Sequence, residues 1–276
     1  MEKIEKKYIE TFSGKIFYFT NKNFDPQKET LVYLHGLSAN HTTWEAFIDD
    51  TEKLGFNCLL LDLRGHGYSD KTIRRSNYTL EVFSKDLLLI LEVENITKYS
   101  LIGYSFGGAI AIDFAGRFCD KGPRLLALVS TNYISPFKYR HLIFFGYIYY
   151  SFLQFLALIT LWHKRKEYLY YQHGKSVGYI DSLQNGFKTM PFSINNWMLS
   201  LIILLDLKEI LPKIKSKTLI VNSAHDLYIS QKETFDMERL IPDAKVSLID
   251  VSGHYIGTNY QDKVRDVMIK FLKENI

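Results

Sequence analysis

The segment Gly103-Tyr104-Ser105-Phe106-Gly107 sets a serine between two glycines, where a strand-like apolar run meets a helical pattern. A tight strand-to-helix turn strains the serine backbone and exposes its hydroxyl. The helix N-terminus behind it stabilises negative charge that develops nearby. Ser105 is therefore the candidate nucleophile for acyl transfer. The alternative, a glycine-rich turn with an incidental serine, is disfavoured by the surrounding strand pattern.

A serine hydroxyl needs a general base, and eight histidines are available. His254 follows Gly253 in a predicted loop between the last strand and the last helix. That loop lies at the carboxyl ends of the strands, on the same edge of the sheet as Ser105. His254 is therefore the candidate base, although a surface loop histidine is the default interpretation of an isolated histidine.

The base in turn needs a carboxylate that fixes its tautomer and stabilises the imidazolium. Asp226 ends the loop Ser223-Ala224-His225-Asp226 after a predicted strand, and its alternative is a turn aspartate. The order Ser105, Asp226, His254 along the chain suits a serine on a strand-to-helix turn. We interpret His225 as a loop residue. One strand earlier, Ser130-Thr131-Asn132 offers no carboxylate.

Two glycine-containing loops accompany these groups. After the predicted strand 30–34, the segment His35-Gly36-Leu37 brings a backbone amide, that of Leu37, to pair with the amide of Phe106 as an oxyanion hole. The loop Asp62–Ser69 lacks the spacing of a phosphate-binding loop. We expect hydrogen bonds to tether Arg64 in that loop and His66 to be scaffold.

Short apolar runs alternate with helical patterns over most of the 276 residues. This alternation predicts βαβ units and a mostly parallel sheet covered by helices on both faces. The rhythm stops at about Ile134 and resumes after Leu205. We therefore predict an α/β core over 1–133 and 206–276, interrupted by a helical insertion over 134–205. The expected strands are 15–21 (an antiparallel edge strand), 30–34, 57–61, 99–103, 125–130, 218–222 and 245–249, and the expected helices are 42–54, 80–93 with Thr79 as N-cap, 105–119, 231–240 and 261–272.

Composition excludes several classes of protein. The chain is 47% hydrophobic and 23% charged, so wholesale disorder is excluded, and its net charge of +4 does not indicate nucleic-acid binding. Cys58 and Cys119 lie in no metal-ligand spacing, which argues against zinc. We interpret both as buried thiols in a reducing compartment. The first seven residues lack the apolar core of a secretory signal, so we expect a cytoplasmic location.

Taken together, these residues resemble the α/β-hydrolase superfamily, in its capped, esterase- or lipase-like serine hydrolase branch. His35-Gly36, the Asp62–Ser69 loop, the turn at Ser105, Asp226 and Gly253-His254 follow the order and spacing of that family. The resemblance implies a mostly parallel sheet of the eight-stranded type with an inserted helical cap. It also implies nucleophile Ser105, acid Asp226, base His254, oxyanion amides from Leu37 and Phe106, and no cofactor or metal.

Three positions depart from the family pattern. Tyr104 stands before the nucleophile, where histidine is frequent, while Ser223 and Ser230 stand where glycine and proline are usual. None of them removes a catalytic group. A serine nucleophile argues against epoxide hydrolases and haloalkane dehalogenases, which form an ester to an aspartate.

Aromatic residues make up 15% of the chain and gather in the insertion. Leu142 to Trp162 carries no charge and is followed by His163-Lys164-Arg165-Lys166, so taken alone this run is a candidate transmembrane helix. A single span would separate Ser105 from Asp226 and His254 across a bilayer. We therefore predict cap helices over the active site. A cap that lies on a membrane surface is the alternative.

An apolar lid indicates a substrate with an apolar moiety. The leading hypothesis is a serine hydrolase of lipophilic carboxylic esters, such as a carboxylesterase or a monoacylglycerol or lysophospholipid hydrolase. The same core also supports hydrolysis of C–C bonds, lactones or amides, and perhydrolysis. A non-enzymatic ligand binder is a third hypothesis, which an intact triad disfavours. The sequence leaves the oligomeric state open.

Overall fold

The computed structural model describes residues 4–163, 188–254 and 258–275. Eight strands form one sheet in the order β1-β2-β4-β3-β5-β6-β7-β8. The pairs β1–β2 and β2–β4 are antiparallel, and the other neighbouring pairs are parallel. The strands are β1 Ile4–Thr11, β2 Gly14–Asn21, β3 Thr30–Leu34, β4 Asn57–Asp62, β5 Tyr99–Tyr104, β6 Leu125–Val129, β7 Lys217–His225 and β8 Ala244–Ser252.

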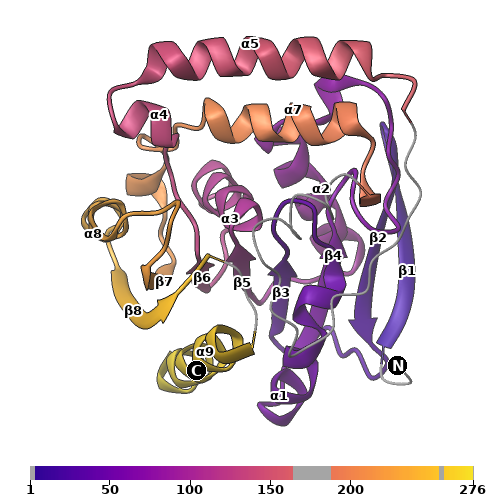
Figure 1. The fold of residues 1–276 in the computed structure, drawn as a ribbon. Helices are drawn as coiled ribbons and strands as arrows, with labels where there is room; N and C mark the ends of the chain where they lie inside the picture. Colours follow the sequence, from indigo (N-terminus) through magenta and orange to yellow (C-terminus); the bar gives the residue numbers. More distant parts are fainter. Residues whose placement is uncertain (1–3, 164–187, 255–257, 276) are drawn as a thin grey trace.

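Helices cover both faces of this sheet (Figure 1). Helices α2 Leu80–Val93, α3 Phe106–Arg117 and α8 Gln231–Leu240 lie on one face, and α1 Ile48–Lys53 and α9 Thr258–Asn275 lie on the other. Every residue of the central strands β3, β4, β5 and β6 is buried, because a parallel strand covered on both sides leaves no face for water. Short 3-10 helices span His41–Phe47, Arg75–Asn77 and Leu211–Lys213.

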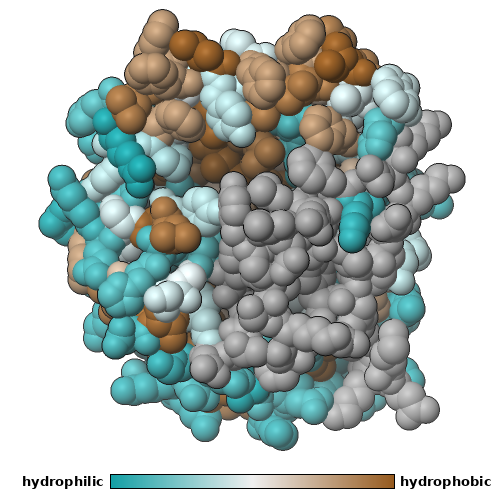
Figure 2. All heavy atoms as spheres, in the orientation of Figure 1, coloured by the Kyte–Doolittle hydropathy of each residue, from teal (hydrophilic) through white to brown (hydrophobic). Residues whose placement is uncertain are grey.

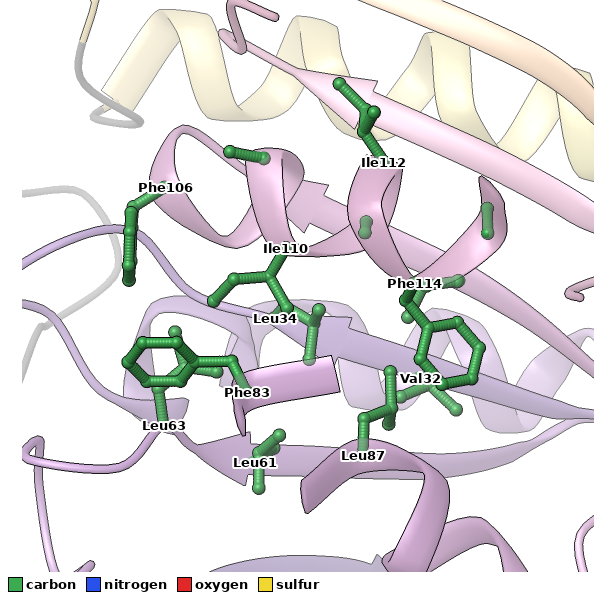
Figure 3. Packing of buried hydrophobic residues seen from close by; sticks show 14 of the residues in the cluster. Val32, Leu34, Leu61, Leu63, Phe83, Leu87, Phe106, Ile110, Ile112 and Phe114 are labelled. Carbon is green, nitrogen blue, oxygen red and sulfur yellow. The ribbon is translucent and has the colours of Figure 1, made fainter. Parts of the chain in front are cut away.

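Helix α3 is the centre of the larger apolar cluster. Its residues Phe106, Ile110 and Phe114 contribute to a cluster that also contains Phe83 of α2 and Leu34 of β3 (Figure 3). The rings of Phe83 and Phe106 meet edge to face with centroids 5.4 Å apart. This packing fixes the start of α3, and with it Ser105, relative to the carboxyl end of the sheet.

Local sequence signals set the boundaries of two helices. Helix α2 has the predicted bounds, and the Thr79 side chain accepts a hydrogen bond from the Val82 amide as its N-cap. Helix α8 also has its predicted bounds. Its N-cap is Ser230, which forms a capping box with Glu233, so serine in place of the family's proline is a helix start.

The predicted edge strand is wrong in one respect. Strand β2 is antiparallel, but it is not an edge, because β1 pairs along its whole length. The β1 sequence IEKKYIET carries charges at several positions, so its hydrophobicity pattern does not predict a strand. Charged side chains on an outermost strand discourage pairing with other chains, so an edge strand need not show clean apolar alternation.

The segment between β6 and β7 is helical where the structure describes it. It contains α4 Pro136–Tyr139, α5 Ile143–Ile159 and α7 Phe192–Ile203. Its two ends meet in a bridge between Ile134 and Asp206, close to the predicted limits of the insertion. Residues 164–187 of the predicted cap lie outside the described residues. The division of the chain into a core and a cap remains a prediction.

Helix α5 occupies most of the uncharged run that raised the question of a membrane span. It has 17 residues and lies along α7, on the side of α7 that faces away from the sheet (Figure 1). Among the described residues, no helix combines the length and hydropathy needed to cross a bilayer.

Candidate active site

Ser105 occupies a sharp turn between β5 and α3. Its backbone has φ 50° and ψ −115°, a strained conformation for a residue with a side chain. The flanking glycines allow this turn. A Cβ on Gly103 would lie 2.6 Å from the Gly107 carbonyl oxygen, and one on Gly107 would lie 2.5 Å from the His35 carbonyl oxygen. The backbone therefore packs too closely here for any side chain, as the sequence predicts.

The structure brings Ser105, His254 and Asp226 into one chain of hydrogen bonds. The Oγ atom of Ser105 lies 3.0 Å from Nε2 of His254. Nδ1 of the same ring lies 2.8 Å from Oδ2 of Asp226. The Asp226 side chain is fully buried, whereas that of His254 is 12% exposed. Three residues separated by up to 149 positions thus lie in the order of donors and acceptors that nucleophilic catalysis needs.

Asp226 is held by its own loop. Strand β7 runs to His225, three residues further than the sequence predicts, so Asp226 follows it directly. Its Oδ1 atom accepts hydrogen bonds from the amides of Tyr228 at 2.7 Å and Ile229 at 3.1 Å, which leaves Oδ2 for His254. The His225 side chain is exposed and contacts Asp250, in keeping with its interpretation as a loop residue.

Two buried histidines fix the loop that carries Leu37. Nε2 of His35 accepts the Leu63 amide at 3.0 Å, and Nε2 of His66 accepts the Ser38 amide at 3.1 Å. Both rings are therefore neutral, with Nδ1 donating to the carbonyl oxygens of Gly36 and Arg64. Burial lowers the pKa of His35 to about 4, against the opposing charge of Asp62, and also lowers the pKa of His66. The residues on either side of Leu37 are thus anchored, and His66 is scaffold.

The two predicted oxyanion amides belong to segments that border Ser105. A Cβ on Gly36, the neighbour of Leu37, would lie 3.4 Å from the Ser105 Cβ. Phe106 is the first residue of α3, so its amide is one of the first-turn N–H groups that have no acceptor within the helix. The geometry therefore suits an oxyanion hole, whose function remains a prediction.

The Asp62–Ser69 loop is held from within, as expected. Arg64 is buried and binds both carboxylate oxygens of Asp86, at 2.9 and 2.6 Å. Its guanidinium also reaches Thr11 and Ser13 in the β1–β2 turn. Asp62 accepts hydrogen bonds from the His41 amide and ring and from the Tyr68 amide. The charged groups of Arg64 and Asp62 thus have partners within the protein, and these contacts hold the loop in its conformation.

Sequence reasoning missed the function of Tyr104. Its hydroxyl donates to the backbone carbonyl of His254, so the residue before Ser105 holds the backbone of the candidate base. The position next to Ser105 was the available signal. The ring of Tyr228 also packs edge to face on His254, with centroids 5.1 Å apart. An alternative acid would follow β6. At that position the hydroxyl of Ser130 forms a hydrogen bond of 2.7 Å with the hydroxyl of Tyr260, and neither group is a carboxylate.

The two cysteines and the possible metal ligands among the described residues also bear on the chemistry of the candidate site. Both thiols are free, and Cys58 is buried. Cys119 is only half-buried, because it lies just beyond α3 near the surface, so the prediction of two buried thiols is wrong for this residue. In the part of the chain that the structure describes, no three His, Cys, Asp or Glu residues cluster in a way that could hold a metal ion.

Comparison with known proteins decides the family. A family model described as the alpha/beta hydrolase fold matches residues 29–257. The chain belongs to the α/β-hydrolase fold family. An uncharacterized protein of Mycobacterium bovis is 34% identical to this α/β hydrolase over 105 residues, which are 37% of this chain and 29% of that protein. The chain thus matches less than a third of that relative's length.

Solved structures agree on the fold of this α/β hydrolase. An enol-lactonase from Burkholderia xenovorans matches 97% of this chain and 100% of its own, with a TM-score of 0.73 and 20% identity. An esterase from Exiguobacterium antarcticum matches 98% of this chain and 100% of its own, with a TM-score of 0.73 and 19% identity. At these identities the likeness extends to the fold alone.

Proposed function

We propose that the protein is a serine hydrolase that cleaves carboxylic esters with a lipophilic moiety. The observation that carries this proposal is the hydrogen-bonded chain from Ser105 through His254 to Asp226. An esterase is also among the solved structures that share this fold. The same hydrogen-bonded chain disfavours a non-enzymatic ligand binder.

In the proposed mechanism, His254 removes the proton from the Ser105 hydroxyl as Oγ attacks the ester carbonyl carbon. Asp226 stabilises the imidazolium that forms. The amides of Leu37 and Phe106 donate to the oxyanion of the tetrahedral intermediate, where such donors contribute most because the charge develops there. His254 then protonates the leaving alcohol. Water, activated by the same ring, cleaves the acyl-enzyme and returns Ser105 to its resting state.

The apolar part of the substrate is assigned from the helices above the site. Helix α7 contacts two loops. Asn195 accepts a hydrogen bond at 3.3 Å from Ser38, in the loop whose Gly36 borders Ser105, and Met198 and Ile194 adjoin Gly65 of the Asp62–Ser69 loop. Both apolar residues are fully buried. We propose that the insertion over 134–205 acts as the lid and that its apolar residues receive the acyl or alcohol chain.

The reducing-compartment interpretation of the two free thiols belongs to the same proposal. Because cytosolic thiols are kept reduced, we place the enzyme in the cytoplasm. The half-buried Cys119 and the buried Cys58 then need no partner.

A panel of p-nitrophenyl esters of increasing acyl length, with an aromatic lactone in parallel, tests the proposal. We expect turnover of the esters to rise from acetate toward medium chains and to vanish in Ser105→Ala. The exposed Ser76→Ala is the matched control and should retain activity. Turnover of the lactone alone would move the assignment to a cyclic ester. Ester turnover that persists in Ser105→Ala would overturn the proposal.

A further inference from the structure

Helix α5 turns its large apolar side chains toward solvent. Phe144 is 70% exposed and Leu158 is 65% exposed, and Trp162 just beyond the helix is 77% exposed. Figure 2 shows this apolar surface gathered along the top of the molecule, over α5. We call the following set the outer face: Leu142, Phe144, Phe145, Tyr147, Ile148, Tyr149, Phe152, Phe155, Leu158, Ile159 and Trp162. Exposed apolar patches of this extent mark interaction sites.

The inner side of the same helix has the opposite character. Its buried residues are Gly146, Leu153 and Ala157, two of which are small. Gln154 donates to the Ser200 hydroxyl of α7 at 2.6 Å. Asn196 and Ser193 lie on the same side of α7 as Ser200, at helical spacing, and are buried. Helix α5 therefore sets a small and polar face on the protein and an apolar face outside. A helix in water shows the reverse arrangement.

A basic residue contacts α5, and two others lie close to it or to its start in the sequence. The Arg75 guanidinium lies over the Tyr150 ring of α5, 5.6 Å from its centroid, and hydrogen-bonds to its hydroxyl. Arg74 beside it and Arg140 before the helix are exposed. The sequence holds no acidic residue between Asp120 and Glu167. Basic residues next to an apolar, aromatic face complement an anionic lipid surface.

We propose that the outer face of α5 docks the protein on the surface of an anionic lipid bilayer, with the helix lying in the plane of the interface. Its 17 residues give a helix of about 25 Å, which suits an in-plane helix better than a crossing. Exposed Trp and Tyr residues favour the headgroup level. A second copy of the chain on this face would bring the arginines of both copies together, which disfavours self-association.

The docking does not depend on the proposed ester hydrolysis, but the two fit together. Helix α7 lies between α5 and the loops that border Ser105, as the contact between Asn195 and Ser38 shows. A membrane-bound enzyme of this shape would hold its site a helix layer above the lipid. Esters dissolved in the bilayer would then be the substrate class closest to the site.

Flotation with vesicles tests the docking directly. The full chain is mixed with equimolar phosphatidylcholine and phosphatidylglycerol vesicles, and with phosphatidylcholine vesicles alone. The double variant Phe155→Gln/Leu158→Gln replaces two apolar side chains of the outer face, which are 58% and 65% exposed, by polar ones. The control Tyr8→Gln/Val93→Gln removes two residues of similar exposure outside α5, at 57% and 55%. Because all four side chains are exposed, both variants should fold, which circular dichroism checks.

We expect the wild type and the control to float with the anionic vesicles and to bind less in high salt. The α5 variant should lose at least about tenfold in partitioning, since each lost group removes apolar burial in the lipid. Equal flotation of both variants, or no flotation of the wild type, would overturn the proposal. So would a wild-type dimer in light scattering that the α5 variant alone abolishes, because a second copy would then cover the face. Hydrolysis of a short soluble ester, measured in parallel, reports separately on the active site.

Discussion

The hydroxyl of Tyr104 donates a hydrogen bond to the backbone carbonyl of His254, 3.0 Å away. Tyr104 is the last residue of β5 and directly precedes Ser105, whose Oγ lies 3.0 Å from Nε2 of the same histidine. Ser105 and Tyr104 thus contact one histidine at two points, the ring and the backbone. This arrangement makes Tyr104 a positioning residue for the proposed base.

Tyr104→Phe should therefore lower kcat for ester hydrolysis by about three- to tenfold, because the ring of His254 is less well held in reach of Ser105. The cost in unfolding free energy should be about 1 kcal/mol, as for one lost hydrogen bond. Tyr99→Phe is the matched control, since its hydroxyl also donates to a backbone carbonyl, at the other end of β5. Equal kcat values in the two variants would refute the positioning role.

Asp226→Asn should reduce kcat by about four orders of magnitude while leaving the fold intact. The amide can still accept from the Tyr228 and Ile229 backbone, but it favours the wrong tautomer of His254 and cannot balance the imidazolium. Stopped-time assays with a p-nitrophenyl ester measure the loss. Asp250→Asn, an exposed aspartate beside His225, is the control and should keep wild-type activity. A residual rate within tenfold of wild type would exclude Asp226 as the acid.

The order of the site along the chain could be predicted because each residue follows a strand. Ser105, Asp226 and His254 come after β5, β7 and β8, and the carboxyl ends of parallel strands meet at one edge of the sheet. The contact between Tyr104 and the His254 backbone could not be predicted in this way. It depends on the fold of the loop after β8, which no local pattern specifies.

Gly107→Ala should destabilise the protein by about 3 kcal/mol or more, since the new methyl group meets the backbone carbonyl oxygens of His35 and Leu34 at 2.5 and 2.6 Å. Backbone atoms cannot move aside as a flexible side chain can. Urea unfolding followed by fluorescence measures the difference. Gly122→Ala meets only ordinary contacts from 3.5 Å and should change the stability by less than about 0.5 kcal/mol. A similar loss for both glycines would show that close packing at the turn is not the cause.

Acid should destabilise the protein through His35. Its pKa falls from 6.5 to about 4 on folding, chiefly through burial, so the unfolded chain binds more protons between those values. The stabilising contribution is complete above pH 6.5 and is lost as the pH falls toward about 4. His66 acts in the same direction. The unfolding free energy from urea titrations should therefore drop between about pH 6.5 and pH 5.

The variant His35→Gln should show a shallower decline over that interval, whereas Ser76→Ala, an exposed substitution that changes no titratable group, should keep the wild-type slope. A wild-type unfolding free energy that stays constant over this interval would contradict the neutral, buried state assigned to His35.

In the insertion, the sequence pattern predicts a helix but not the side of that helix that faces the protein. The uncharged run around α5 was correctly predicted as helical, but its periodicity did not reveal which side faces the protein. Most of the large apolar side chains point outward, and of the three buried residues Gly146, Leu153 and Ala157 two are small, so hydrophobicity and burial are largely uncoupled here. Strand β1 presented the converse problem, because charges at an edge concealed a paired strand. In both places the tertiary surroundings, and not the local sequence, decide the structure.

Active-site labelling with a fluorophosphonate probe, followed by peptide mass spectrometry, shows whether Ser105 is the nucleophile. We predict one labelled residue, Ser105, in the wild type, much slower labelling in Asp226→Asn, and none in Ser105→Ala. Labelling of the Ser105→Ala variant at another serine, or an unlabelled wild type that still hydrolyses esters, would contradict the account.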